Sequence, residues 1–163
     1  MTARRLWFGL LAYWLVAAVS LALVHPERRE QWPPLVGLIV GAAAGAGLVV
    51  ALSGCRPRLP PPGLLPVVIV VSAVAEETVW RRLVLGTLAD RAGTTPALVA
   101  STVAFALAHR SGRRIHLATG AVFGGLYVTS ASLVCAASAH VVYNLALRGM
   151  APAQRTSGVG AAR

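Results

Sequence analysis

Six polar side chains interrupt the apolar runs in the second half of this sequence, and their types suit acid–base chemistry. They are Glu76, Glu77, Arg81, His109, His140 and Asn144. If these runs lie in a membrane, each ionised group costs about 2.5–3.5 kcal/mol on insertion scales. Two adjacent carboxylates double that cost and repel each other, so ordinary packing does not account for them. We therefore interpret the set as a functional site.

Helical spacing sorts these side chains onto faces. Glu77 and Arg81 are four residues apart, so they can pair along one face of a helix. Glu76 then lies about 100° around the helix, where an unpaired carboxylate in a low-dielectric site can act as a general base. His140 and Asn144 are also four residues apart, and they present an imidazole and an amide from one face.

This combination suits the hydrolysis of a peptide bond. A carboxylate and an imidazole can share a water molecule and remove its proton. A second His and an Asn can donate hydrogen bonds to the oxyanion that develops on the carbonyl. Phe105 and His109 are four residues apart, which predicts an aromatic ring beneath an imidazole. The sequence contains no HExxH, so the usual helical zinc-protease motif is absent.

Three short motifs in this order resemble the CPBP family of intramembrane proteases, which includes the type II CAAX prenyl endopeptidases. Residues 76–81 match EExxxR, residues 105–109 match FxxxH, and residues 140–144 match HxxxN. The resemblance covers about residues 64–147, which would form the motif-bearing core. Arg82 departs from the family pattern, because Gly usually follows the motif Arg.

The resemblance implies a role for each matched residue. Glu76 and His109 would activate the attacking water, while His140 and Asn144 would form the oxyanion site. The supporting residues would be Glu77, Arg81 and Phe105. Members of this family are described both as metalloproteases and as metal-free glutamate proteases, so the cofactor is zinc, another divalent ion or none.

The candidate metal ligands are Glu76, His109 and His140. One carboxylate and two His can bind zinc with an open position. Their spacing in the sequence does not decide between a metal and a metal-free mechanism.

The composition places the motifs in a membrane. Hydrophobic residues make up 56% of the 163 residues and charged residues only 12%, whereas a soluble domain carries about 25% charged residues. Lipid must therefore cover much of the surface. The 15 Arg, with no Lys, lie between apolar runs rather than in a continuous basic stripe. That pattern sets membrane topology and argues against nucleic acid as a partner.

Six segments approach the length of about 20 mostly apolar residues that a membrane-spanning helix needs. They are residues 6–24, 34–52, 64–90, 96–109, 115–129 and 131–147. The first segment could instead be a signal peptide, but its apolar core is long for one and further apolar segments follow. Residues 55–63 contain four prolines and predict a loop. We expect one membrane-embedded domain over residues 1–150 and a disordered tail over residues 151–163.

Arg residues orient the expected spans. With the N-terminus in the cytoplasm, the inside segments hold Arg4, Arg5, Arg56, Arg58, Arg110, Arg113, Arg114, Arg148, Arg155 and Arg163. Arg in the outside segments lies beside an equal number of acidic residues, so the net charge of +10 falls on one side. We therefore expect an all-α, polytopic transmembrane helix bundle in the bacterial cytoplasmic membrane, with both termini cytoplasmic.

Other residues have simpler interpretations. Gly41 and Gly45 form a GxxxG pattern, for which packing within one chain is favoured over a dimer face. His116 is expected to be an interfacial residue rather than a ligand. Trp80 is expected either to line the site or to pack as an ordinary apolar residue.

The sequence thus predicts a membrane-embedded endopeptidase, whose partners are the lipid bilayer and a peptide or lipid-associated protein substrate. The alternative is a non-catalytic membrane protein of the same fold, such as a bacteriocin-immunity or partner-binding protein. A Glu76→Gln variant with full cellular function would favour that alternative. The sequence leaves the oligomeric state unknown.

Overall fold

The computed structural model describes residue 11, residues 14–19 and residues 31–150. These residues form helices and no strand, which confirms the all-α expectation. The main helices are α2 (Pro34–Ser53), α3 (Leu64–Glu77), the π-helix η1 (Thr78–Leu85), α4 (Gly86–Ala92), α5 (Thr94–Ala108), α6 (Arg113–Ser130) and α7 (Leu133–Met150). The expected tail at 151–163 and most of the expected first span at 6–24 lie outside the described residues.

Local sequence signals explain where the helices begin and end. α2 has Pro34 in its first turn, where the missing N–H costs nothing. It ends at Gly54, whose left-handed φ of 66° lets its N–H bond the Val50 carbonyl at 2.8 Å. Residues 55–63 form the expected loop. For the second to sixth expected segments, no boundary differs from the observed one by more than three residues.

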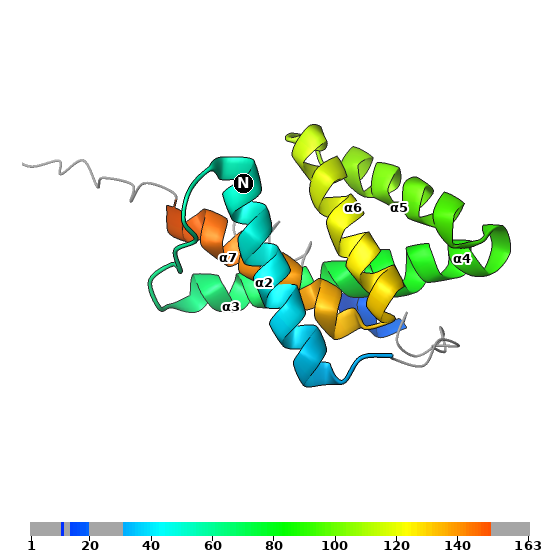
Figure 1. The fold of residues 1–163 in the computed structure, drawn as a ribbon, viewed down its shortest axis with the longest axis horizontal. Helices are drawn as coiled ribbons and strands as arrows, with labels where there is room; N and C mark the ends of the chain where they lie inside the picture. Colours follow the sequence, from blue (N-terminus) through cyan, green and yellow to red (C-terminus); the bar gives the residue numbers. More distant parts are fainter. Residues whose placement is uncertain (1–10, 12–13, 20–30, 151–163) are drawn as a thin grey trace, which may run out of the picture.

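A long helical rod, formed by α3, η1 and α4, runs from Leu64 to Ala92 along the length of the molecule (Figure 1). The sequence predicts one helix here, but the π-helix between Thr78 and Leu85 was not expected. A π-turn bonds i to i+5, which inserts extra backbone and changes the direction of the side chains that follow. It begins directly after Glu77, so it includes the last four residues of the first motif and continues beyond it.

α2 packs closely across α7 because three glycines face that helix (Figure 1). Gly37, Gly41 and Gly45 are buried. A Cβ on Gly41 would overlap the Cys135 carbonyl, and one on Gly45 would overlap the Ala139 carbonyl. The glycine pattern therefore serves packing within the chain, as the sequence analysis favoured.

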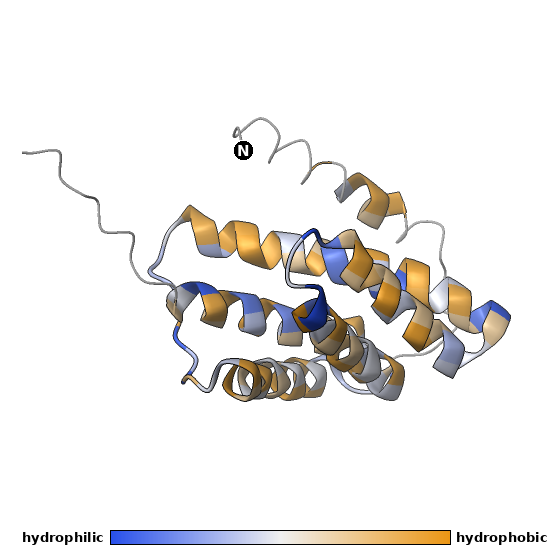
Figure 2. Cartoon of the chain, turned by 90° about the horizontal axis from the view of Figure 1, so that it is seen from above, coloured by the Kyte–Doolittle hydropathy of each residue, from blue (hydrophilic) through white to orange (hydrophobic). Residues whose placement is uncertain are grey.

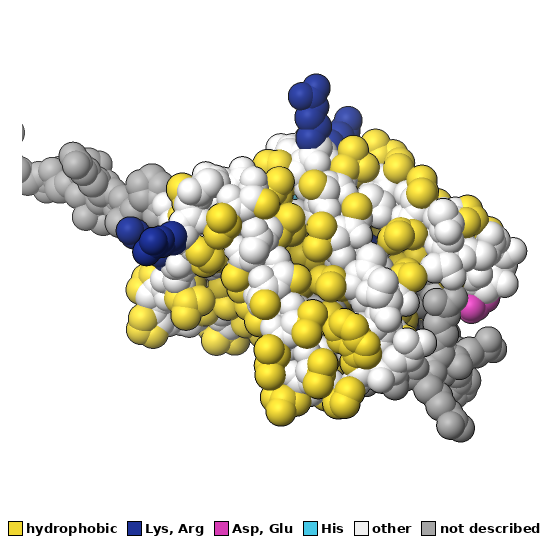
Figure 3. All heavy atoms as spheres, viewed as in Figure 1, with side chains coloured by type: hydrophobic (Ala, Val, Ile, Leu, Met, Phe, Trp, Pro, Cys, Tyr) yellow, Lys and Arg dark blue, Asp and Glu magenta, His cyan; other side chains and the backbone are white. Residues whose placement is uncertain are grey.

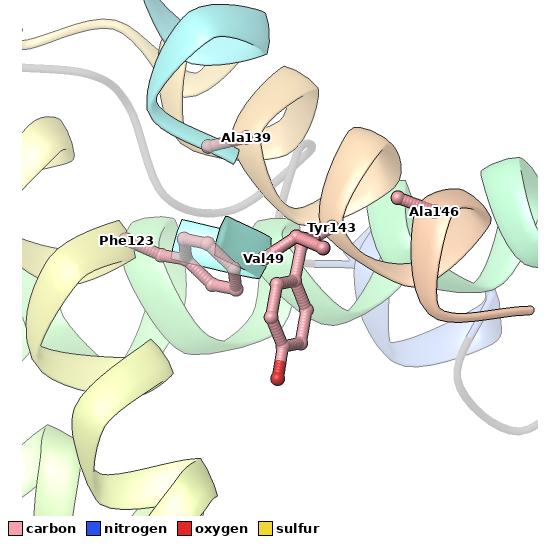
Figure 4. Packing of buried hydrophobic residues seen from close by; sticks show 5 residues of the cluster. All are labelled: Val49, Phe123, Ala139, Tyr143 and Ala146. Carbon is pink, nitrogen blue, oxygen red and sulfur yellow. The ribbon is translucent and has the colours of Figure 1, made fainter. Parts of the chain in front are cut away.

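The main apolar cluster lies where α2, α6 and α7 meet (Figure 4). It contains Val49, Phe123, Ala139, Tyr143 and Ala146. Phe123 and Val49 lie close to the Tyr143 ring in this view. The cluster fixes α7, which also lies against α3, and α7 carries the third motif.

The outer surface suits lipid. Large apolar side chains on α2, α3 and α5 are exposed, and they include Leu35, Ile39, Leu64, Val99 and Leu107. Figure 2 shows helices that are largely hydrophobic, with hydrophilic residues at the connections and in bands along some of the helices. In Figure 3, Arg side chains project at the edges of a largely hydrophobic face.

Two of the described helices, α2 and α7, are long and apolar enough to cross a membrane, and α5 is a shorter apolar helix. The count of six spans stays a prediction.

Candidate active site

Glu77 joins two of the motifs. Its carboxylate is completely buried, and Oε2 accepts a hydrogen bond from Arg81 Nε at 2.7 Å. Oε1 lies 2.8 Å from Nδ1 of His140, which is 63 residues away in sequence. The expected pairing of Glu77 with Arg81 is confirmed. The contact with His140 was not expected, and it joins the end of α3, where the π-helix begins, to α7.

This contact fixes the proton on His140. The Glu77 carboxylate is already bound to a guanidinium, so it is ionised and can only accept hydrogen bonds. Nδ1 of His140 must therefore carry the hydrogen, which leaves Nε2 for a reacting group. The His140 ring is buried and stacks on Phe123, with centroids 4.9 Å apart. Its position is thus held by both a hydrogen bond and a ring contact.

His109 is held in a similar way at the end of α5. It leaves the helix with an extended backbone, at φ −93° and ψ 128°. Its Nδ1 donates to the Phe105 carbonyl at 2.8 Å. Because a carbonyl only accepts, Nε2 of the neutral ring carries the free lone pair. His109 therefore presents a hydrogen-bond acceptor at Nε2. A side chain that orients an attacking water molecule needs such an acceptor.

His116 stacks on His109, with ring centroids 3.7 Å apart and planes 19° apart. His116 was expected at the membrane interface from the sequence, and its contact with His109 was not expected. The turn between α5 and α6 makes it possible, because Gly112 adopts a left-handed φ of 68°. The seven-residue spacing and the glycine were the available signals, but neither one identifies a stacked pair by itself.

Phe105 is the centre of the ring cluster and is 1% exposed. Its centroid lies 4.7 Å from that of His109, which confirms the expected ring beneath the imidazole. It also meets Trp80 at 5.5 Å and His140 at 6.4 Å, both edge to face. The Arg81 guanidinium carbon lies 5.4 Å from the ring centroid. Phe105 therefore contacts side chains from all three motifs.

Glu76 remains outside the buried ion pair. It is half-buried, and no described side chain makes a hydrogen bond to its carboxylate. The charges that act on it most strongly come from His140, His109, Glu77 and Arg81. Glu76 is thus within electrostatic reach of both motif imidazoles, and no described side chain forms a hydrogen bond with its carboxylate.

Asn144 lies one turn beyond His140 on α7 and is half-buried. It lines a groove of about 410 Å³ with Ser72 of α3 and Arg148 of α7. No hydrogen bond joins it to Glu76 or His109 among the described residues. Asn144 is therefore adjacent to the other motif residues without being tied to them.

The proposed metal ligands do not close around one ion. Within residues 31–150, no three side chains of His, Cys, Asp or Glu gather closely enough to hold a metal. Nδ1 of each imidazole faces a protein acceptor, the Phe105 carbonyl for His109 and the Glu77 carboxylate for His140, so Nε2 is the ring atom that could meet a ligand. As placed, Glu76, His109 and His140 do not fit a three-ligand metal site.

Three buried nitrogen atoms near the motifs lack a protein partner among the described residues. They are Trp80 Nε1, Arg81 Nη1 and Arg81 Nη2. Both residues contact the Phe105 ring, so these donors lie around the same cluster. A buried donor that is left unpaired is costly.

One family model matches the chain. It is described as Type II CAAX prenyl endopeptidase Rce1-like, and it covers residues 58–146. The match spans more than half of the chain and includes all three motifs. No curated protein and no solved structure matches.

Proposed function

The chain belongs to the Rce1-like family of type II CAAX prenyl endopeptidases, and we propose that it is a glutamate-type intramembrane endopeptidase. One observation carries this proposal. Glu77 binds Arg81 and His140, while Glu76 forms no hydrogen bond with a described side chain and is within electrostatic reach of His109 and His140. A structural protein would gain nothing from the second carboxylate, whereas a hydrolase needs a base of this kind.

In the proposed reaction, Glu76 acts as the general base. A water molecule held between Glu76 and Nε2 of His109 loses a proton to the carboxylate as its oxygen attacks the scissile carbonyl carbon. When the tetrahedral intermediate collapses, the C–N bond breaks. The protonated Glu76 then returns its proton to the leaving amine. The apolar wall of Phe105 and Trp80 lowers the local dielectric and strengthens these interactions.

His140 and Asn144 would stabilise the oxyanion. His140 can donate from Nε2 only as an imidazolium, because Nδ1 already donates to Glu77. The buried Glu77 carboxylate orients the His140 ring through Nδ1, and Arg81 holds the carboxylate in place. The Asn144 amide, one turn away, supplies the second donor. Glu77 is thus a positioning residue in this scheme.

We propose that this reaction needs no metal. The proposal is supported by the placement of the three candidate ligands, which form no group that could hold a metal ion among the described residues. All proton transfers are accounted for by Glu76.

We also propose six spans in the bacterial cytoplasmic membrane, within one domain over residues 1–150. Two contacts support the expected alternation of the connecting segments between the outer and the inner side of the membrane. The Gln31 N–H bonds the Ser130 carbonyl at 3.3 Å, which joins two segments expected outside. The Arg58 carbonyl lies against Gly149, which joins two segments expected inside. The substrate would be a peptide or a lipid-associated protein that is cleaved at the inner membrane face.

The direct test is proteolysis by protein purified into nanodiscs, with a farnesylated peptide and a mixed peptide library. Wild type, Glu76→Gln and His109→Ala would be compared with Leu107→Ala, a control at an exposed position of α5. We expect cleavage by wild type and Leu107→Ala, and loss in the two site variants. Equal cleavage by all four proteins would indicate a contaminating protease. No cleavage by folded wild type would favour the non-catalytic alternative.

A further inference from the structure

Three exposed arginines, which we call the turn arginines, lie in and beside the turn that joins α5 to α6. They are Arg110, Arg113 and Arg114. The acidic side chains within residues 31–150 are Glu76, Glu77 and Asp90, and no ion pair in this part of the chain joins them to the turn arginines. The first turn of α6 contains no acidic side chain, and the helix dipole disfavours cations there. The turn arginines therefore repel one another, and the described part of the chain does not neutralise them.

The same turn places two imidazoles of the candidate site. His109 directly precedes the first turn arginine, and its backbone has already left the helix. His116 follows in α6, and its ring stacks on that of His109 with centroids 3.7 Å apart. Gly112, with its left-handed φ of 68°, turns the chain between them. Repulsion that opens this turn would separate the two rings, so the position of His109 depends on how the charge of the turn is balanced.

An exposed apolar stripe on α5 leads to this turn. Val99, Val103 and Leu107 are four residues apart, so they lie along one face of the helix, and all three are exposed. Ile115, directly after the turn arginines, is exposed as well. In Figure 3, Arg side chains project beyond a partly hydrophobic surface at the end where α5 and α6 are joined. A phospholipid has the same order of groups, with acyl chains along the helix and a phosphate at its end, whereas a soluble anion would match only the arginines.

We propose that the turn arginines bind the phosphate of an anionic phospholipid in the inner leaflet, and that this lipid holds His109 in the candidate site. The effect on cleavage rests on the proposed function, whereas the lipid binding does not. A guanidinium matches a phosphate with two parallel hydrogen bonds, and an anionic leaflet attracts arginines near its surface. A headgroup bound from both sides of Gly112 neutralises the repulsion and closes the turn. Lipid charge thereby regulates the enzyme through the position of one imidazole.

The first measurement is hydrogen exchange of residues 109–116 in nanodiscs of phosphatidylcholine, alone or mixed with phosphatidylglycerol. Wild type would be compared with a variant in which all three turn arginines are Gln. The matched control is Arg56→Gln with Arg58→Gln, at two exposed positions of the other described loop that is expected on the inner side. We expect phosphatidylglycerol to slow exchange at least about fivefold in wild type and in the control, the effect of one arginine near a charged surface. The triple variant should exchange equally in both lipids.

The second measurement is kcat/KM for an uncharged peptide, which an anionic membrane does not concentrate. Phosphatidylglycerol should raise it about fivefold in wild type and in the Arg56 and Arg58 control, and should leave it unchanged in the triple variant. A response to phosphatidylglycerol that persists in the triple variant would overturn the inference. So would its loss in the control, because lipid charge would then act on the whole inner face.

Inorganic phosphate, added to nanodiscs of phosphatidylcholine alone, tests for a soluble anion. If it slows exchange as much as phosphatidylglycerol does, the site is not a lipid site and the inference fails. Slower exchange in phosphatidylglycerol without any gain in Glu76-dependent cleavage would overturn the regulatory part and leave the proposed function intact. Slower exchange with no cleavage by folded wild type in either lipid would support the lipid site and count against the proposed function.

Discussion

Gly41→Ala is the sharpest test of the packing that positions α7. An added Cβ would overlap the Cys135 carbonyl and the Ser138 hydroxyl. The carbonyl belongs to the backbone of a helix and cannot rotate away. α2 must therefore move outward by about an ångström to restore ordinary contact, which loosens the cluster around Val49 and Ala139.

The expected change in the free energy of unfolding follows from two opposing effects. Overpacking of this kind typically costs about 1–3 kcal/mol. Replacing Gly by Ala within a helix gains up to about 1 kcal/mol from helix propensity. Gly47→Ala is the matched control, because it lies on the same helix and its Cβ would meet nothing within 4 Å. The two variants should therefore differ in unfolding free energy by about 1–3 kcal/mol, with Gly41→Ala the less stable.

Thermal unfolding in one detergent at one protein concentration measures this difference. For a chain of this size, 1 kcal/mol shifts Tm by about 2–4 °C. We expect Gly47→Ala to melt at or slightly above wild type and Gly41→Ala to melt clearly below it. Equal Tm values for the two variants would refute the close α2–α7 contact.

Arg81→Met leaves the buried Glu77 carboxylate without its cation, so it should lower the free energy of unfolding by about 3–5 kcal/mol. Adding Glu77→Gln to this variant should recover part of the loss, and thermal unfolding would measure both effects. His116→Ala should lower kcat more than it changes KM, because it removes the ring that holds His109, whereas His116→Phe should retain most of the activity. Equal losses in the two variants would contradict the stacking role. Treatment with EDTA should leave peptide cleavage unchanged, and activity that disappears and returns only with zinc would contradict the metal-free mechanism.

The sequence predicts those features of the fold that depend on local periodicity. Apolar runs and their Pro and Gly boundaries place α2 and the loop after it, and four-residue spacing predicts the Glu77–Arg81 pair and the ring of Phe105 beneath His109. These features depend on residues within a few positions of each other.

Contacts between segments that are distant in sequence could not be predicted from the spacing of residues. The bond from Glu77 to His140 depends on how α3 packs against α7, and the stacking of His116 depends on the direction of the turn at Gly112. The π-helix has no composition signal, because its residues would also form an ordinary helix. The added residue per turn is explained only by the packing around it.

The two adjacent carboxylates show why both local and distant contacts are needed for the proposed chemistry. One helix places Glu77 about 100° from Glu76, so only one of them can face Arg81 and the buried Nδ1 of His140. Glu77 therefore holds Arg81 and His140 in place, and the energy of its burial is offset by the Arg81 cation and by the hydrogen bond with His140. Glu76 is left half-buried beside two imidazoles, with no bond that must break before it accepts a proton. A single carboxylate could not both neutralise the buried Arg81 and remain free to act as a base, which is the physical reason for expecting two.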